Sequence, residues 1–223
     1  ELLLEVKGLT NDSIKDVSFE IKRGEILGFA GLVGAGRTEV ARAIFGMDPV
    51  NSGEIYLEGK KINIKNPRDA VDNGIMMASE DRRKYGLVTK RSVLENISLP
   101  NYNRYSKTLF LNGKVETEYS SDICKKLQIK TPSLKTQAAS LSVGNQQKLV
   151  IGKWLISNPK VFILDEPTRG IDVGAKTEIY KLICELAAEG MAIIMISSDL
   201  PELLGMSDRI YTTPAGCRRQ EGS

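Results

Sequence analysis

Two hydrophobic periodicities alternate along this chain. Continuous apolar runs at residues 25–31, 75–79, 161–166 and 191–198 predict buried strands, because each run is short and is followed by glycine or polar residues. Residues 53–64 alternate between apolar and polar positions instead, which predicts two strands joined by a tight turn.

Helical periodicity separates these strands. The clearest helix covers residues 175–189, where five apolar residues share one face and Gly190 follows as a stop signal. The five residues are Ile179, Leu182, Ile183, Leu186 and Ala187. Shorter helices are expected over 38–45, 67–74 and 200–208, and a last strand is expected from residue 209. Alternating strands and helices predict an α/β fold.

The middle of the chain has a different pattern. From about residue 92 to 127 it is helical, with Tyr119, Ile123 and Leu127 at i, i+4 and i+8. Residues 131–140 are expected to form a polar linker. The region therefore predicts a helical insertion within the α/β fold.

These patterns predict a single domain over residues 1–223. Its α/β core would comprise about 1–86 and 156–211, and its helical subdomain about 87–155. The polar tail, residues 212–223, has no periodicity and is expected to be disordered or an artificial addition. Because the chain begins with Glu1 rather than methionine, we expect it to be a piece of a longer protein.

Composition narrows the function classes. The chain has no histidine and three scattered cysteines, so zinc sites, disulfide frameworks and histidine general bases are not expected. A formal net charge of +3 is too small to indicate nucleic-acid binding. No leader opens the chain and no apolar run is long enough to cross a bilayer, which predicts a cytoplasmic protein.

A glycine-rich loop at residues 31–38, GLVGAGRT, is the first candidate for chemistry. Gly31 and Gly36 are followed by a basic residue, Arg37, and by Thr38, and the loop joins a predicted strand to a predicted helix. In that context, backbone N–H groups can surround phosphate oxygens while the hydroxyl contacts Mg²⁺. A glycine-rich turn without a ligand is the alternative, and the carboxylates described next favour the phosphate loop.

Two carboxylates end the apolar run VFILDE. Asp165 can hold a Mg²⁺-bound water, and Glu166 can polarise an attacking water. A solvated strand end is the alternative interpretation. A third stretch, LSVGNQQK, offers Ser142 as an N-cap and Gly144 as a position of close backbone approach, although alone it predicts only a capped helix.

The order of GLVGAGRT, LSVGNQQK and LDEPTRGID resembles the nucleotide-binding domain of ATP-binding cassette (ABC) transporters over about Leu3 to Tyr211. SEDRRKYGLV, LSVGNQQK and ISSDLPE further resemble the second, C-terminal cassette of tandem-cassette importers for ribose, other monosaccharides and autoinducer-2. The resemblance implies a P-loop NTPase fold with a mainly parallel core sheet, an antiparallel β subdomain and a helical subdomain.

The resemblance also implies roles for individual residues. ATP would be bound by the loop residues Gly31, Leu32, Val33, Gly34, Ala35, Gly36, Arg37, Thr38 and Glu39. Mg²⁺ would be held by Thr38, Asp165 and Glu80. Glu80 stands at the position of the family's Q-loop glutamine and would also bind the nucleotide. Glu166 would be the catalytic base, and Ser198 occupies the position of the switch histidine.

The signature motif and its partners follow from the same resemblance. Ser142, Val143 and Gly144 would close on ATP held by a companion cassette, and Asp172 would lie at that interface. The companion would be the N-terminal half of the same polypeptide. Transmembrane permease subunits and, indirectly, a periplasmic or lipid-anchored sugar-binding protein would complete the assembly. The chain would therefore be peripheral on the inner face of the cell membrane.

Several substitutions depart from the family pattern. Arg37 replaces the usual lysine, Ser198 the switch histidine and Glu80 a neutral glutamine, and Val143 would be strained if its position required a positive φ. No aromatic residue precedes Phe19 to stack on adenine.

These departures predict a degenerate site. We expect the chain to bind Mg·ATP and to couple ATP binding or hydrolysis to sugar uptake, with weak hydrolysis at its own site because of Arg37 and Ser198. The alternative is a non-hydrolysing half-site that serves as a structural or regulatory partner of an active cassette. An ABC ATPase acting on DNA or ribosomes is less favoured, because the chain has no coiled-coil or strongly basic insertion.

Overall fold

The computed structural model describes residues 1–31, 36–81, 86–101 and 113–212. It divides into two compact units, which we describe separately. The sheet unit comprises Glu1–Met77, Pro159–Pro167 and Ile183–Ser223, and the helical unit comprises Ala78–Asn158 and Thr168–Leu182. The single-domain organisation with a helical part at 87–155 stays a prediction.

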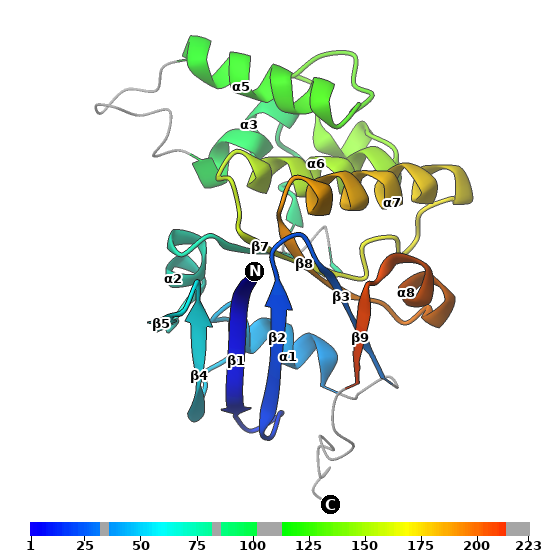
Figure 1. Cartoon of the computed structure of the whole chain (residues 1–223). Helices are drawn as coiled ribbons and strands as arrows, with labels where there is room; N and C mark the ends of the chain where they lie inside the picture. The colour runs from blue at the N-terminus through cyan, green and yellow to red at the C-terminus, as the bar shows by residue number, and fades with distance from the viewer. Residues whose placement is uncertain (32–35, 82–85, 102–112, 213–223) are drawn as a thin grey trace, which may run out of the picture. The chain divides into compact units, whose positions relative to one another are not determined.

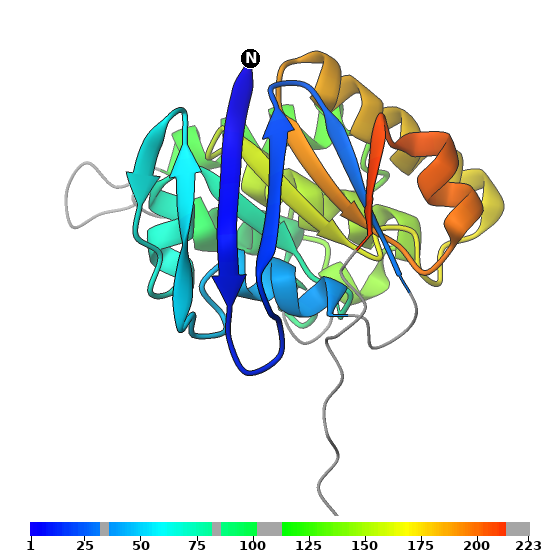
Figure 2. The same cartoon turned by 60° about the horizontal axis from the view of Figure 1, so that its bottom comes forward.

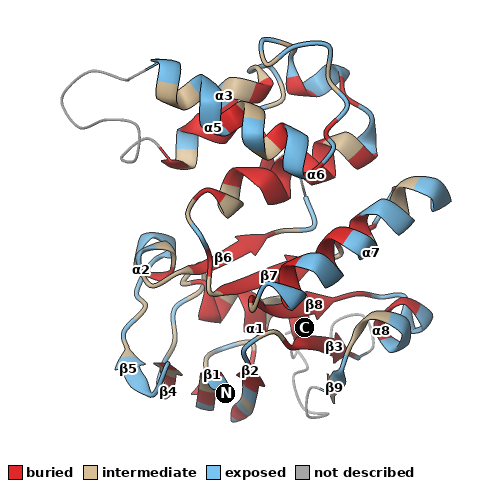
Figure 3. Ribbon diagram, turned by 45° about the horizontal axis from the view of Figure 1, so that its top comes forward, coloured by how far each residue is buried: buried red, intermediate tan, exposed pale blue. Residues whose placement is uncertain are grey.

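A five-stranded sheet forms the centre of the sheet unit, in the order β6-β7-β8-β3-β9 (Figure 1). Its strands are β3 (Ile26–Ala30), β6 (Ile75–Ala78), β7 (Val161–Asp165), β8 (Ala192–Ile196) and β9 (Arg209–Thr212). The pairs β7–β8, β8–β3 and β3–β9 are parallel. Every residue of β3, β6, β7 and β8 is buried, which explains why these strands are continuous apolar runs (Figure 3).

A second, antiparallel sheet has the order β2-β1-β4-β5 (Figure 2). Its strands are β1 (Leu2–Thr10), β2 (Val17–Lys22), β4 (Ser52–Leu57) and β5 (Lys60–Ile62). The predicted strand pair within residues 53–64 is confirmed as β4 and β5. Strands β1 and β2 were not predicted from periodicity, although the resemblance implied an antiparallel subdomain, and that implication is confirmed.

One hydrophobic core joins residues of both sheets. Phe19 of β2 meets Phe29 of β3 edge to face, with ring centroids 5.1 Å apart, and Tyr211 of β9 lies 5.2 Å from Phe29. Such aromatic contacts add to the burial of apolar area, which contributes about 25 cal/mol per Å². The antiparallel sheet is thereby held against the central one.

The helices of the sheet unit begin where the sequence predicts them. Helix α1 covers Arg37–Ile44, α2 covers Pro67–Asp72 with Asn66 as N-cap, and α8 covers Leu200–Met206 with Asp199 as N-cap. Helix α7 (Val173–Ala188) continues from the helical unit into the sheet unit. All five residues predicted for its apolar face are buried.

The helical unit contains α3 (Val93–Ser98), η2 (Leu99–Asn101), α5 (Gly113–Lys126), η3 (Ala138–Ser140), α6 (Val143–Leu155) and the first part of α7. The predicted face of α5 is partly wrong, because the Tyr119 side chain is 52% exposed whereas Ser120, Cys124 and Leu127 are buried. The expected polar linker 131–140 has no α-helix or strand and is mostly not buried, although it contains η3, the buried Ala138 and a bridge from Gln137 to Ser92.

An ion pair joins β9 to the turn before β3. Glu25 is 8% exposed, and it accepts hydrogen bonds from the Arg209 guanidinium and from the Lys22 amide. Burial alone would raise the pKa of Glu25, but these hydrogen bonds and the charge of Arg209 outweigh it and lower the pKa below 4.5. The ionised carboxylate is therefore a stabilising group of the folded state.

We predict that Arg209→Met destabilises the protein by about 1–2 kcal/mol at neutral pH, because it leaves a buried carboxylate with one hydrogen bond fewer. Since the folded-state pKa of Glu25 is lowered, its contribution is present above the ordinary pKa and is lost as pH falls through the lowered value. Urea unfolding at pH 7 and pH 3.5 measures this. A difference between variant and wild type that does not shrink at pH 3.5 would contradict the explanation.

Candidate functional site

The N-terminus of α1 follows the glycine-rich loop. Gly36 is the N-cap and has φ 81°, a left-handed conformation that favours glycine. Thr38 and Glu39 lie in the first turn of the helix, where unpaired N–H groups and the helix dipole favour an anion. Residues Leu32, Val33, Gly34 and Ala35, which were expected to contact the nucleotide, lie outside the described residues.

Thr38 and Asp165 meet at the carboxyl edge of the parallel sheet. The Thr38 hydroxyl donates to Asp165 Oδ1 at 3.4 Å, and Asp165 is 2% exposed at the last position of β7. The two come together because parallel strands end at the same edge, and because α1 starts where the chain leaves β3. A hydroxyl and a carboxylate oxygen are ligands that suit Mg²⁺, which takes few protein ligands when phosphates supply others.

Glu166 and Ser198 form a second contact at this edge. The Glu166 backbone has φ 50°, which is strained for a residue with a side chain, and its amide donates to the Ile196 carbonyl at 2.8 Å. The Ser198 hydroxyl donates to Glu166 Oε2 at 3.2 Å. The structure therefore brings together the two residues expected to be catalytic.

Arg37 is turned toward the end of β8. Arg37 is 8% exposed, and its Nη1 donates a hydrogen bond to the Ser197 carbonyl at 2.7 Å. Sequence reasoning missed Ser197, and no signal in the sequence marks its carbonyl as a partner. Because this hydrogen bond uses one N–H group of the guanidinium, Arg37 is held by the protein itself whether or not a phosphate is bound.

The hydroxyl of Ser142 is oriented by Asn145. As N-cap of α6, Ser142 Oγ accepts from the Asn145 amide at 3.4 Å and from Asn145 Nδ2 at 2.8 Å. The hydroxyl oxygen of Ser142 thus accepts two hydrogen bonds, and its proton points away from Asn145. Asn145 is a second residue that sequence reasoning missed, although its spacing of three from an N-cap serine could have indicated it.

Val143 and Gly144 open helix α6. Val143 is the first helical residue and is absent from the positive-φ positions of the described chain, so the strain considered for a β-branched residue does not arise. At Gly144, an added Cβ would lie 2.8 Å from the Ala175 Cβ on α7. Glycine is therefore required for the close packing of α6 on α7.

A buried lysine makes a second connection between these helices. Lys148 of α6, with a side chain 5% exposed, donates to Glu178 Oε2 of α7 at 2.7 Å and to the Gln128 carbonyl at 3.2 Å. The hydrogen bond from Lys148 lowers the pKa of Glu178. Helix α6, which begins after Ser142, thus contacts α7 at its first turn through Gly144 and at its middle through Lys148.

Two further expected site residues lie in the helical unit. Asp172 caps α7, since its Oδ1 accepts from the Ala175 amide at 3.0 Å. Glu80 forms an ion pair with Arg169. The structure thus brings together Thr38 with Asp165, and Glu166 with Ser198, in the sheet unit, whereas Glu80, Ser142 and Asp172 belong to the helical unit. That Asp172 and Glu80 contact nucleotide, partner or metal stays a prediction.

Within the part of the chain that the structure describes, no group of three or more acidic, cysteine or histidine side chains could hold a metal ion by itself. A magnesium site made of Thr38 and Asp165 would therefore need further oxygens, from a bound phosphate and from water. Among the same residues, no helix has the length and apolar character to span a membrane.

A glycine loop before α1, paired with an acidic strand end in a parallel sheet, defines the chain as a nucleoside-triphosphate-binding domain of the P-loop class. The profile of the family described as ABC transporter matches residues 14–169. The chain belongs to the ABC transporter family.

Individual relatives agree with this assignment. The chain is 54% identical to a xylose import ATP-binding protein of Thermoanaerobacter pseudethanolicus, covering 97% of this chain and 45% of the relative. It is 51% identical to a ribose import ATP-binding protein of Bacillus licheniformis, covering 96% of this chain and 44% of the relative. The chain thus spans less than half the length of these relatives.

Solved structures show the same fold. A nucleotide-free ATP-binding cassette from an ABC transporter superposes with a TM-score of 0.82 at 23% identity, covering 96% of this chain and 88% of that one. An ATP-binding cassette in its ADP conformation superposes with a TM-score of 0.79 at 24% identity, covering 96% and 87%. The predicted ABC fold, with a parallel sheet, an antiparallel sheet and helices, is therefore confirmed.

We predict that Gly144→Ala destabilises the protein by about 1–3 kcal/mol, because the new methyl group would overlap a methyl group that cannot rotate away. Ala175→Gly removes the opposing Cβ but has its own cost of about 1 kcal/mol as a glycine in helix α7, so the double variant should be less destabilised than the sum of the two single variants. Gly205→Ala is the matched control, since nothing lies within 4 Å of its added Cβ and it sits in helix α8. Thermal unfolding of Gly144→Ala, Ala175→Gly, the double variant and Gly205→Ala measures the effect, and strictly additive losses in the double variant would refute the packing explanation.

Proposed function

We propose that this chain is the ATP-binding cassette of a sugar importer, which binds Mg·ATP at a degenerate site and couples ATP binding or hydrolysis to solute uptake. The contact of Thr38 with Asp165 at the start of α1 carries the proposal, because it places a hydroxyl and a carboxylate beside a helix N-terminus. The names of the relatives, which are import ATP-binding proteins for xylose and ribose, support the transport role.

Binding would be the task of the loop and the first turn of α1. Backbone N–H groups of residues 31–39 would receive the phosphates, while Thr38 and Asp165 would provide oxygens to Mg²⁺. When bound, Mg²⁺ supplies positive charge that offsets the negative charge of the phosphates. Arg37 keeps a positive charge in the site, but its hydrogen bond to the Ser197 carbonyl competes with a phosphate for the guanidinium.

Hydrolysis at this site would depend on Glu166. A carboxylate can accept a proton from a water molecule that it orients, and the Ser198 hydroxyl holds Oε2 in place. Ser198 donates one hydrogen bond but cannot take up a proton near neutral pH as a histidine can. We therefore propose weak hydrolysis at this site, and a companion cassette that performs most of the turnover.

The partners of this chain follow from the same proposal. Ser142 directs its proton away from Asn145 and would donate to a phosphate oxygen of ATP held by the companion cassette. The companion would be an N-terminal half of the same polypeptide, and the relatives, which are more than twice the length of their match to this chain, support a second half. Permease subunits and a sugar-binding protein would complete a transporter at the inner face of the membrane.

A second function is a half-site that binds ATP without hydrolysing it and regulates an active cassette. The buried Arg37 and its bond to Ser197 favour this alternative, because a guanidinium held in this way is less available to the terminal phosphate during transfer. The two functions differ in turnover, not in binding.

We predict that Mg·ATP binds to the chain, and that Asp165→Asn weakens binding by at least about tenfold, because the neutral amide loses the charge that a metal ligand provides. Asp72→Asn is the control, since Asp72 lies at the exposed end of α2. Calorimetric titration with and without Mg²⁺ measures both. If the wild-type chain does not bind at millimolar ATP, the proposal of a nucleotide site fails.

We predict that Glu166→Gln removes less than about half of the ATP turnover of the assembled transporter, whereas the equivalent change in the companion cassette removes most of it. Phosphate release is the measurement. Loss of half or more from Glu166→Gln would show that this site hydrolyses ATP at a full rate, and an unchanged rate would support the binding-only alternative.

A further inference from the structure

An ion pair within the helical unit joins Glu80 to Arg169. Both side chains are substantially exposed, with 45% of Glu80 and 63% of Arg169 accessible to solvent. Both residues belong to the helical unit. An exposed pair of this kind contributes little to the free energy of folding, so its value lies in the segments that it connects.

Those segments are two of the chain's passages between the units. The chain leaves the sheet unit after Met77 and again after Pro167. Glu80 follows the first passage by three residues and Arg169 follows the second by two. The strands that lead into these passages, β6 and β7, are neighbours in the sheet, and β7 ends at Asp165. The ion pair therefore links the connection that follows β6 to the connection that follows the acidic end of β7.

The backbone around Arg169 forms a hydrogen-bonded turn. The Ile171 amide donates to the Thr168 carbonyl at 3.1 Å, and Gly170 has φ 71°, which makes residues 168–171 a tight turn. Thr168 is 3% exposed, so the turn is anchored at its first residue. Arg169 lies within this turn, four residues after Asp165 along the chain.

We propose that Arg169 is a positioning residue, which pairs with Glu80 to fasten the two connections together and to transmit the state of the Asp165–Glu166 strand end to the segment of Glu80. The transmission rests on the proposed nucleotide site, whereas the fastening does not. In this assignment the carboxylate at position 80 is neutralised by Arg169 and is not a magnesium ligand.

Amide hydrogen exchange in the full-length protein, assembled with its membrane subunits, tests the fastening without nucleotide. Glu80→Arg and Arg169→Glu should each speed exchange about fivefold in both connections, residues 78–81 and 168–171, including the one that carries no substitution. The double variant Glu80→Arg/Arg169→Glu restores opposite charges and should return both connections to within about twofold of wild type. Arg169→Lys keeps the charge and should retain most of the protection.

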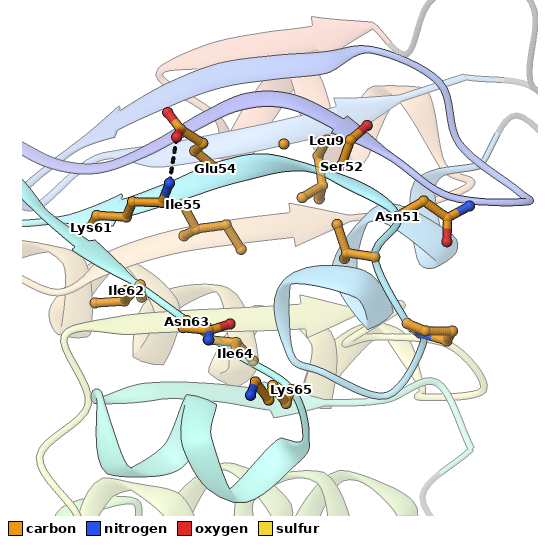
Figure 4. Close-up of a pocket in the computed structure, with 13 residues that line it drawn as sticks. Leu9, Asn51, Ser52, Glu54, Ile55, Lys61, Ile62, Asn63, Ile64 and Lys65 are labelled. Atoms are coloured by element: carbon orange, nitrogen blue, oxygen red, sulfur yellow. Dashed lines mark hydrogen bonds and ion pairs between the residues drawn. The ribbon is translucent and has the colours of Figure 1, made fainter.

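A second ion pair of similar exposure provides the matched control. Glu54 and Lys61 pair across β4 and β5, beside a pocket of about 740 Å³ (Figure 4), and neither residue belongs to a connection between the units. Their side chains are 41% and 59% exposed. Glu54→Lys and Lys61→Glu should leave exchange in both connections unchanged. This result would show that losing any surface ion pair is not enough to speed exchange there.

Effects confined to the substituted connection, or no recovery in the double variant, would overturn the proposal. Addition of Mg·ATP then tests transmission: exchange in residues 78–81 should respond in wild type and in the double variant, and should respond at least about fivefold less in each single variant. If calorimetry shows no Mg·ATP binding to wild type, the proposed function fails, while the nucleotide-free exchange still decides the fastening. If wild type binds Mg·ATP and residues 78–81 do not respond, transmission fails and the proposed function stands.

Discussion

The chemistry of this protein depends on where parallel strands can carry polar groups. Strands β3, β7 and β8 are buried along their whole length, so an ionised side chain in their middle would lose its hydration without compensation. The ionisable residue among them, Asp165, is also buried, but it ends β7 and accepts a hydrogen bond from the Thr38 hydroxyl. The carboxyl ends of these parallel strands lie at one edge of the sheet. Thr38 after β3, Asp165 at the end of β7 and Ser198 after β8 all lie on these exits. The candidate site therefore lies at the carboxyl edge of the parallel sheet, where these three residues follow or end their strands.

The groups at this edge restrain one another. Glu166 keeps a strained backbone because its amide bonds to the Ile196 carbonyl, and its carboxylate accepts the Ser198 hydroxyl. Arg37 is held by the Ser197 carbonyl in the same way. These contacts organise the site, yet they also engage groups that phosphate transfer would use. The proposal of weak hydrolysis at this site rests on these engaged groups.

The contacts within the helical unit fix the direction of one hydroxyl, that of Ser142. Asn145 occupies the acceptor positions of Ser142, and α6 is fixed to α7 by the close approach at Gly144 and by the buried Lys148. All of these contacts lie inside the unit, so the orientation of Ser142 does not require the sheet unit. The Glu80–Arg169 pair differs, because it acts on the connections that lead into this unit.

The sequence by itself determined the local elements and the residue types of the site. Continuous apolar runs marked the buried strands, the face of α7 was read correctly, and the glycine loop with the acidic strand end indicated a phosphate-binding fold, because these signals depend only on neighbours along the chain. The orientation of α5 was misjudged, since Tyr119 fits a helical stripe but the packing of the unit selects Ser120 and Cys124 instead. Only the tertiary structure decided that Arg37 bonds to Ser197, that Gly144 makes room for Ala175 and that Glu80 meets Arg169. Each of these contacts joins residues distant in sequence, whose meeting is set by strand order and helix packing and leaves no periodic signal in the chain.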